Sequence, residues 1–177
     1  MKLLTLLILM TMIPQDNSVI FDFQRQKGAA TWYVVNDGVM GGLSQGKMSI
    51  NDAGNGVFKG YVTTENNGGF SSVRHSFSKK DVSNFKVVKL RIKGDGKPYQ
   101  FRIKANEAQQ YSFIQEFKTS GEWETIVIPF DSFYPSFRGN KLNRPNYDGK
   151  FMEEVTFLIG NKKKEAFALE IERIWLE

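Results

Sequence analysis

The chain of 177 residues has no cysteine and a single histidine, His75. The missing cysteine excludes a disulfide, a thiolate nucleophile and a cysteine-ligated metal site. A single histidine excludes a multi-histidine metal centre within one chain and leaves one candidate for a histidine general base. His75 lies in an alternating segment and no Gly-x-Ser-x-Gly motif is present, so we interpret it as an ordinary strand residue. The sequence therefore predicts no enzyme activity, no catalytic residues and no cofactor.

Helical periodicity is missing as well. From Val19 onward no apolar pattern with a helical period extends over ten or more residues, and neither a P-loop nor a dinucleotide-binding fingerprint is present. In their place, aromatic residues make up 14% of the chain and glycine occurs 16 times. Aromatic side chains suit a half-buried strand and glycines suit turns, so the composition favours an all-β fold.

Period-two patterns recur along the rest of the chain. The predicted strands cover residues 57–64, 70–77, 88–93, 99–104, 111–117, 123–130, 155–159 and 167–172. About nine antiparallel strands, each with one buried face, predict a sandwich or barrel. No linker or internal repeat divides the chain, so we expect one domain over residues 19–177. Asp-Gly at the centre of residues 93–98 predicts a hairpin there, and the long irregular stretch 135–150 is a further candidate for function.

Residues 1–18 form an apolar leader in which Lys2 precedes an apolar run and polar residues follow Pro14. This order is typical of a secretory signal peptide, and the segment is not arginine-rich and amphipathic as a mitochondrial transit peptide is. The run is too short to span a bilayer as a stable helix, so membrane contact is expected only through an uncleaved leader. We expect an exported protein, periplasmic or extracellular, or a cytoplasmic one if the leader instead joins the fold.

The net charge of +5 is spread along the chain. The densest basic run covers residues 162–164, beside Glu165, and no RNA- or DNA-binding motif accompanies it. A solvated turn between two strands explains such a run, so we expect no nucleic-acid partner.

Two glycine-rich stretches interrupt the strand pattern. Residues 32–44 read WYVVNDGVMGGLS, and residues 64–74 read TENNGGFSSVR. Their asparagine and aspartate side chains can bond nearby backbone amides, and their glycines can adopt positive φ. The stretches are therefore either corners that pin neighbouring strands together or the polar rim of a binding surface.

Several side chains in these stretches admit more than one use. Asp37, Glu65 and Asp95 are candidates for the paired carboxylates of a glycosidase, and the first two lie in the two stretches, although these residues also suit turns. Asp37 with Asn36 and Asn67 offers oxygen ligands for a structural Ca²⁺. Arg74 offers a planar donor fork to a ligand, or a bond to a loop carbonyl or Asp37 that locks the two stretches together. For a sugar, the candidate aromatic residues are Trp32, Tyr33, Phe70, Tyr134 and Tyr147.

The strings NDGVMGGLS at 36–44 and ENNGGFSSVR at 65–74 resemble the signature of the complex I intermediate-associated protein 30 family. The resemblance extends over residues 20–175 and includes the Gly-Asp-Gly turn at 94–96, the Trp123 to Phe130 segment and Arg138-Gly139. It implies a jelly-roll β-sandwich that is galactose-binding-domain-like and similar to some carbohydrate-binding modules. Mitochondrial members act as assembly factors for respiratory complex I and are not regarded as enzymes.

The resemblance thus implies a non-catalytic binding or assembly domain with a protein partner. The alternative is a carbohydrate-binding module-like domain that acts outside the cytoplasm. In either case we expect the binding residues to come from the two glycine-rich stretches and the Arg-Gly loop: Asn36, Asp37, Met40, Ser44, Asn66, Asn67, Phe70, Ser72, Arg74 and Arg138.

Overall fold

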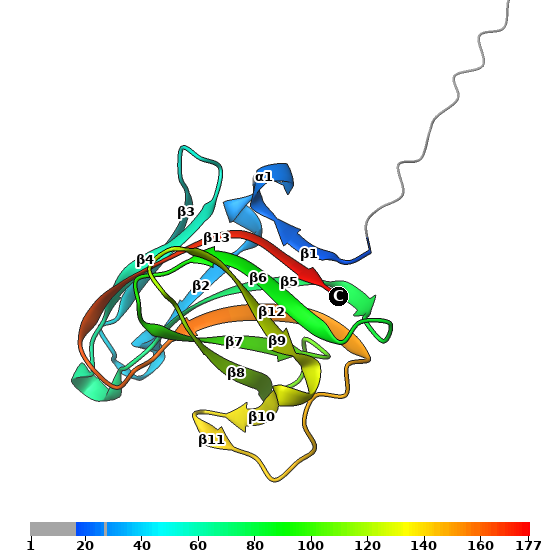
Figure 1. The fold of residues 1–177 in the computed structure, drawn as a ribbon. Coiled ribbons are helices and arrows are strands. Elements are labelled where there is room, and N and C mark those ends of the chain that lie inside the picture. The colour runs from blue at the N-terminus through cyan, green and yellow to red at the C-terminus, as the bar shows by residue number, and fades with distance from the viewer. Residues whose placement is uncertain (1–16, 27) are drawn as a thin grey trace, which may run out of the picture.

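The computed structural model describes residues 17–26 and 28–177, so nearly all of the predicted leader lies outside the described residues. The described part folds into two antiparallel sheets that pack face to face (Figure 1). This confirms the predicted all-β sandwich, and every segment predicted as a strand is one. No helix in the described ranges is long and apolar enough to cross a membrane.

The first sheet has six strands. Their order is β3 (Gln45–Ile50), β4 (Gly56–Val62), β13 (Glu165–Leu176), β6 (Val87–Lys93) and β9 (Trp123–Pro129), with β1 (Val19–Asp22) paired to the last part of β13. A four-residue helix, α1 (Phe23–Gln26), follows β1.

The second sheet has seven strands. Their order is β11 (Asn140–Lys141), β10 (Tyr134–Phe137), β8 (Ser112–Lys118), β7 (Pro98–Lys104), β12 (Phe151–Ile159), β5 (Ser71–Asp81) and β2 (Tyr33–Asn36). Strands β10 and β11 therefore lie at the opposite end of the sheet from β2 (Figure 1). Strands β1, β2, β10 and β11 have four residues or fewer, too few for an alternating pattern to reveal them.

Four single turns of 3-10 helix complete the described secondary structure. They cover Ala29–Thr31, Asp37–Met40, Glu65–Asn67 and Phe130–Ser132. The second and third lie in the two glycine-rich stretches: the second directly follows β2, and the third lies between β4 and β5.

The hydrophobic core fills the space between the sheets. Alternate residues of each strand point into it, so β7 contributes Phe101 and Ile103 while its polar residues point away. Phe101 packs edge-on against Phe157 of β12, with the ring centroids 5.1 Å apart. Burying an aromatic or aliphatic side chain of this size contributes about 1.5–3 kcal/mol, so these inner faces stabilise the sandwich.

The predicted hairpin at residues 93–98 is wrong. Strand β6 belongs to the six-stranded sheet and β7 to the seven-stranded sheet, so this segment crosses between layers. The side chain of Asp95 directs the crossing, because it accepts hydrogen bonds from the Tyr99 hydroxyl (3.0 Å) and from the backbone N–H of Ala168 in β13 (3.0 Å). These tertiary contacts outweigh the local preference of Asp-Gly for a two-residue hairpin.

Candidate functional site

Asp37 lies at the end of β2 and joins the two glycine-rich stretches. Its carboxylate is buried, with 6% of the residue exposed. It accepts hydrogen bonds from the Ser44 hydroxyl (2.5 Å) and the Ser44 N–H (3.1 Å) in its own stretch. It also accepts bonds from the N–H groups of Gly69 (2.6 Å) and Phe70 (3.3 Å) in the second stretch. One carboxylate thus holds two distant loops together.

The surroundings of Asp37 favour its charged form. Burial by itself raises the pKa of Asp37, but the bonds from Ser44, Gly69 and Phe70 outweigh burial and lower the pKa below its ordinary value. A Cβ atom at Gly42 or Gly68 would collide with this carboxylate, which explains a glycine at both positions. We name the set Asn36, Asp37, Ser44, Gly69 and Ser71 the Asp37 junction.

The other polar atoms of the junction are also engaged internally. The side-chain oxygen of Asn36 accepts bonds from the Ser71 hydroxyl (2.6 Å) and the N–H of Gly46 (3.1 Å). The N–H of Thr63 donates to the Ser44 hydroxyl (3.1 Å). These bonds connect β2 and β5 in one sheet to β3 and the end of β4 in the other. The junction therefore acts as a corner that fixes the two sheets relative to each other.

The remaining predicted site residues lie in several places. Ser72 donates its hydroxyl to the carbonyl of Val35 (3.0 Å), and Asn66 donates its amide to the carbonyl of Gly41 (3.1 Å). Arg138 is exposed in the β10–β11 turn at the far end of the second sheet. The structure therefore does not bring Arg138 together with the junction. The side chains of Met40 and Asn67 lie outside the described residues.

The contacts of Asp37 also bear on the candidate Ca²⁺ site and on the candidate glycosidase-type carboxylates. Both oxygens of Asp37 are occupied by internal donors, and Glu65 is exposed and paired with Lys164. Among the described residues no group of three or more histidine, cysteine, aspartate or glutamate residues is arranged to hold a metal ion. In the described structure the Asp37 carboxylate is thus fully engaged by donors from the two glycine-rich stretches.

Arg74 contacts neither Asp37 nor a loop carbonyl, because it points to the outer face of the seven-stranded sheet. In direct cross-strand register, six residues from six strands form one line across that face. Residues paired in this way share a face, and their chain neighbours point into the core. We name this line the outer row; in order it contains Tyr33, Arg74, Thr156, Arg102, Ile114 and Tyr134.

The residues of the outer row differ in exposure. Thr156 and Ile114 are short and buried, whereas 43% of Tyr33 is exposed at one end. The Tyr33 hydroxyl donates to the Glu154 carboxylate at 2.8 Å, and burial of the hydroxyl together with this bond raises the pKa of Tyr33. At the other end, the Lys141 ammonium lies 5.1 Å from the centre of the Tyr134 ring.

The two arginines of the outer row differ in their contacts. Arg102 donates to the side-chain oxygen of Gln100 from Nε (3.0 Å) and from a terminal nitrogen (2.6 Å). Burial, and then the positive charge of Arg74, lower the pKa of Arg102 to about 10. In the described part of the chain, Nε of Arg74 is buried and has no hydrogen-bond partner. A buried donor without a partner costs about 1–3 kcal/mol, so Arg74 is the candidate ligand-binding group of the row.

Sequence reasoning found only part of this face. Tyr33, Arg74 and Tyr134 were among the candidates, whereas Trp32 and Tyr147 are buried in the core. The polar residues Gln100, Arg102, Glu154 and Thr156 were missed because each occupies an ordinary outward position of an alternating strand. Only the strand order and register reveal that they meet.

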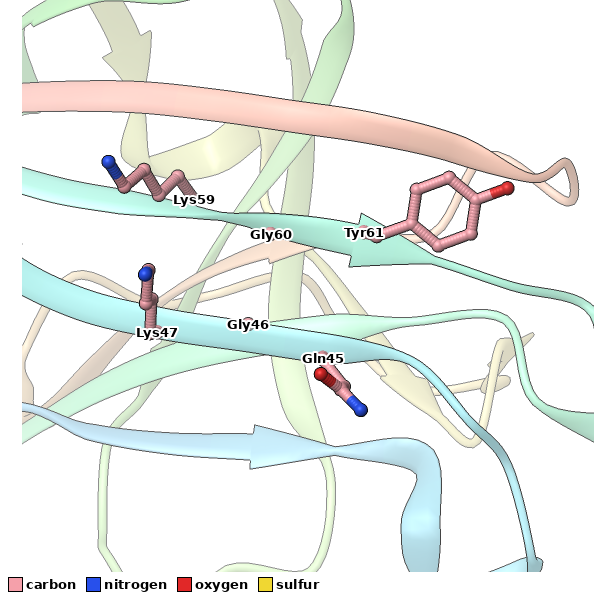
Figure 2. Close-up of a pocket in the computed structure, with 6 residues that line it drawn as sticks. All are labelled: Gln45, Gly46, Lys47, Lys59, Gly60 and Tyr61. Atoms are coloured by element: carbon pink, nitrogen blue, oxygen red, sulfur yellow. The ribbon is translucent and has the colours of Figure 1, made fainter.

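A second feature lies on the outer face of the six-stranded sheet. Gly46 and Gly60 are cross-strand partners on β3 and β4, and a hollow of about 340 Å³ opens over them. Figure 2 shows Lys47 and Lys59 on one side of this glycine pair, with Gln45 and Tyr61 on the other. These four rim side chains are all exposed, so the hollow lacks the buried polar groups that fix a ligand's orientation.

The sequence that contains both glycine-rich stretches matches a known protein family. The family model described as Complex I intermediate-associated protein 30 (CIA30) matches residues 21–171. The chain belongs to the complex I intermediate-associated protein 30 family. This confirms the resemblance seen in the motifs at 36–44 and 65–74.

A curated relative bears the same family name. The Mus musculus protein "Complex I intermediate-associated protein 30, mitochondrial" is 26% identical over 191 residues. The match covers 94% of this chain but only 58% of the mouse protein. Because this member of the complex I intermediate-associated protein 30 family is named as mitochondrial, the predicted exported or cytoplasmic location is wrong. The apolar run at the N-terminus was an insufficient guide to the compartment.

Solved structures with the same fold include carbohydrate-binding modules. The family 11 module from Clostridium thermocellum, in complex with a β-1,3-1,4-mixed-linked tetrasaccharide, has a TM-score of 0.64 at 20% identity and covers 90% of this chain and 94% of its own. The family 11 module of the cellulase Lic26A-Cel5E from that organism has a TM-score of 0.63 at 19% identity, covering 89% and 92%. These likenesses confirm the galactose-binding-domain-like sandwich for this complex I intermediate-associated protein 30 family member.

Proposed function

We propose that residues 19–177 form a non-catalytic, assembly-factor-type binding domain that engages a protein partner through the outer face of the seven-stranded sheet. The observation that carries the proposal is Arg74, whose Nε is buried in the outer row without a partner in the described structure. Family membership supports a protein partner. The Asp37 junction supports the face indirectly, since it fixes β2 and β5, which supply Tyr33 and Arg74.

A pair of matched tyrosines tests which sheet faces the partner. Tyr33 and Tyr61 lie on the outer faces of opposite sheets and are 43% and 46% exposed. Each is replaced in turn by the photo-crosslinker p-benzoylphenylalanine, in cells that naturally produce the protein. We expect one dominant protein adduct from position 33 and none from position 61, read by gel mobility and mass spectrometry. Equal adducts at both positions, or none at position 33, would overturn the proposal.

The second candidate function is carbohydrate binding, which one specific observation favours. Tyr33 and Tyr134 stand at the two ends of the outer row, which includes two arginines, and aromatic rings beside planar hydrogen-bonding groups suit a sugar. A solved structure of this fold holds a mixed-linked tetrasaccharide. Calorimetric titration with that tetrasaccharide separates the candidates. Micromolar binding that is lost in Tyr33→Ala, with Tyr61→Ala as the control, would replace the protein-partner proposal.

A further inference from the structure

The outer row places two guanidinium groups on either side of one threonine. Thr156 is the cross-strand partner of Arg74 in β5 and also of Arg102 in β7. Neighbouring strands lie about 4.8 Å apart, so the two arginine backbones are about 10 Å apart. Long arginine side chains readily converge over such a gap. The short Thr156 between them is buried, so the two arginine side chains form the surface of the row at this point.

The charges of these two arginines are not balanced by the acids beside them. In the described rows that flank the outer row, the carboxylates are Glu154 and Glu116. Glu154 accepts a bond from the Tyr33 hydroxyl and lies 3.7 Å from the Lys104 ammonium. Glu116 accepts a bond from the amide of Gln100 at 3.1 Å. Each acid therefore has other partners, while no ion pair joins either of them to an arginine of the row.

The hydrogen bonds from Arg102 to Gln100 also leave the charge of Arg102 unbalanced. Gln100 holds Arg102 in place with an uncharged oxygen, which orients the guanidinium without neutralising it. Arg74 lacks even that contact, since its Nε is buried and unbonded among the described residues. Two adjacent, partly desolvated guanidinium groups repel each other and favour an anion between them. The geometry of a guanidinium fork matches the two oxygens of a carboxylate.

We propose that Arg74 and Arg102 form a carboxylate-binding site, and that its occupant is an acidic side chain in an extended segment of a protein partner. This rests on the proposed function and names the chemistry of the partner. A peptide is favoured over an acidic sugar because the proposed function has a protein partner. Ile114 in the row and Leu158 in the neighbouring row are buried on the outer face, so the surroundings of the two guanidinium groups are partly apolar. Surroundings of low dielectric constant strengthen the attraction between an arginine and a carboxylate.

Nuclear magnetic resonance reads this site directly. The probe is the capped tetrapeptide Leu-Glu-Glu-Leu, titrated into ¹⁵N-labelled protein while the arginine Nε–H signals are followed. We expect the signals of Arg74 and Arg102 to shift and that of Arg91 to stay. Arg91 is the matched reference, because it lies on a strand of the other sheet and stacks over the Trp123 ring. The capped peptide Leu-Gln-Gln-Leu should leave all three signals unchanged.

Substitutions then assign the binding energy. Arg74→Gln and Arg102→Gln should each weaken the acidic peptide about tenfold, the usual effect of removing one charge-assisted hydrogen-bonding group. Arg91→Gln removes the same charge elsewhere and should leave the affinity unchanged. Arg74→Lys keeps the charge but loses the fork, and should give an intermediate loss. Equal weakening by Arg91→Gln would reduce the effect to net charge and overturn the site.

Two further experiments distinguish a peptide from a sugar ligand and the carboxylate site from the proposed function. Trigalacturonate carries carboxylates on a sugar, so tighter binding of trigalacturonate than of the peptide would overturn the peptide occupant. The photo-adduct from position 33 is also measured in the double variant Arg74→Gln, Arg102→Gln. An undiminished adduct without peptide binding would reject the carboxylate site and leave the proposed function standing. Peptide binding without any adduct from position 33 in the protein that keeps both arginines would reject the protein-partner function while the carboxylate site stands.

Discussion

The Asp37 junction and the outer row are both rich in polar groups, yet they treat those groups in opposite ways. In the junction, one buried carboxylate receives four hydrogen bonds from two loops. In the outer row, the buried Nε of Arg74 receives no partner from the described chain. Satisfied polar groups stabilise a fold, whereas a buried unsatisfied group carries a cost that a ligand can remove. This difference supports the proposal that the first region is structural and the second binds a partner.

Asp37→Ala should give the largest effect and tests the junction side of the comparison. The substitution leaves the N–H groups of Ser44, Gly69 and Phe70 without their acceptor in a buried place. We expect a loss of about 3–4 kcal/mol in the free energy of unfolding. Urea denaturation measures it. Asp52→Ala, at an exposed turn position, is the control and should stay within about 0.5 kcal/mol. Similar values for both variants would show that the junction is not structural.

The pH dependence at His75 should give an intermediate effect and sharpens the contrast between the two faces of β5. His75 follows Arg74 but points into the core, where it contacts the rings of Phe21 and Trp32. Burial lowers the pKa of His75 despite its bond to the Thr31 carbonyl. The unfolded chain therefore takes up a proton near the ordinary pKa of about 6.5, while the folded chain does so only at lower pH.

Folding stability should accordingly be constant above about pH 7.5 and fall as the pH drops from about 6.5 toward the folded pKa of His75. Urea denaturation at pH 7.5 and 5.5 measures this change. His75→Phe should remove it, because the chain has no other histidine. If the variant and the unsubstituted protein lose stability equally over this range, the burial of His75 does not control it.

Arg74→Ala should give the smallest effect on stability and tests the binding side of the comparison. Because Nε of Arg74 has no partner in the described structure, its removal breaks no internal bond there. We expect no loss larger than about 0.5 kcal/mol in the free energy of unfolding, because removing the unpaired donor offsets the packing lost with the side chain. The same variant should lose the photo-adduct from position 33. A loss of stability as large as that of Asp37→Ala would show that Arg74 is a structural residue, and the proposed difference between the junction and the outer row would be wrong.

The sequence was a good guide to the strands and a partial guide to the site. Strict alternation located β6, β7 and β13 because one face of each is buried in the core. It did not reveal that β6 and β7 belong to different sheets, since a turn motif reports local geometry and the contacts of Asp95 with β13 are distant in sequence. The motifs identified Asp37 as important, but spacing alone did not distinguish a corner from a binding rim.

Arg102 and Glu154 show why the rest of the site stayed hidden. Each is an unremarkable polar residue in its own strand, and nothing local distinguishes it from a solvated position. Their meeting depends on which strands are neighbours and on the register between them, and both are set by long-range pairing. A site built from one residue per strand leaves no motif along the chain.

The same construction has a mechanical consequence. The outer row runs across β2, β5, β12, β7, β8 and β10, perpendicular to the chain direction. A ligand held at both ends of the row spans every one of these strands and opposes any sliding of one past the next. Its occupancy would therefore slow amide hydrogen exchange throughout the sheet, including in strands where it touches a single side chain. A bound partner would therefore restrain the whole seven-stranded sheet in addition to being bound by it.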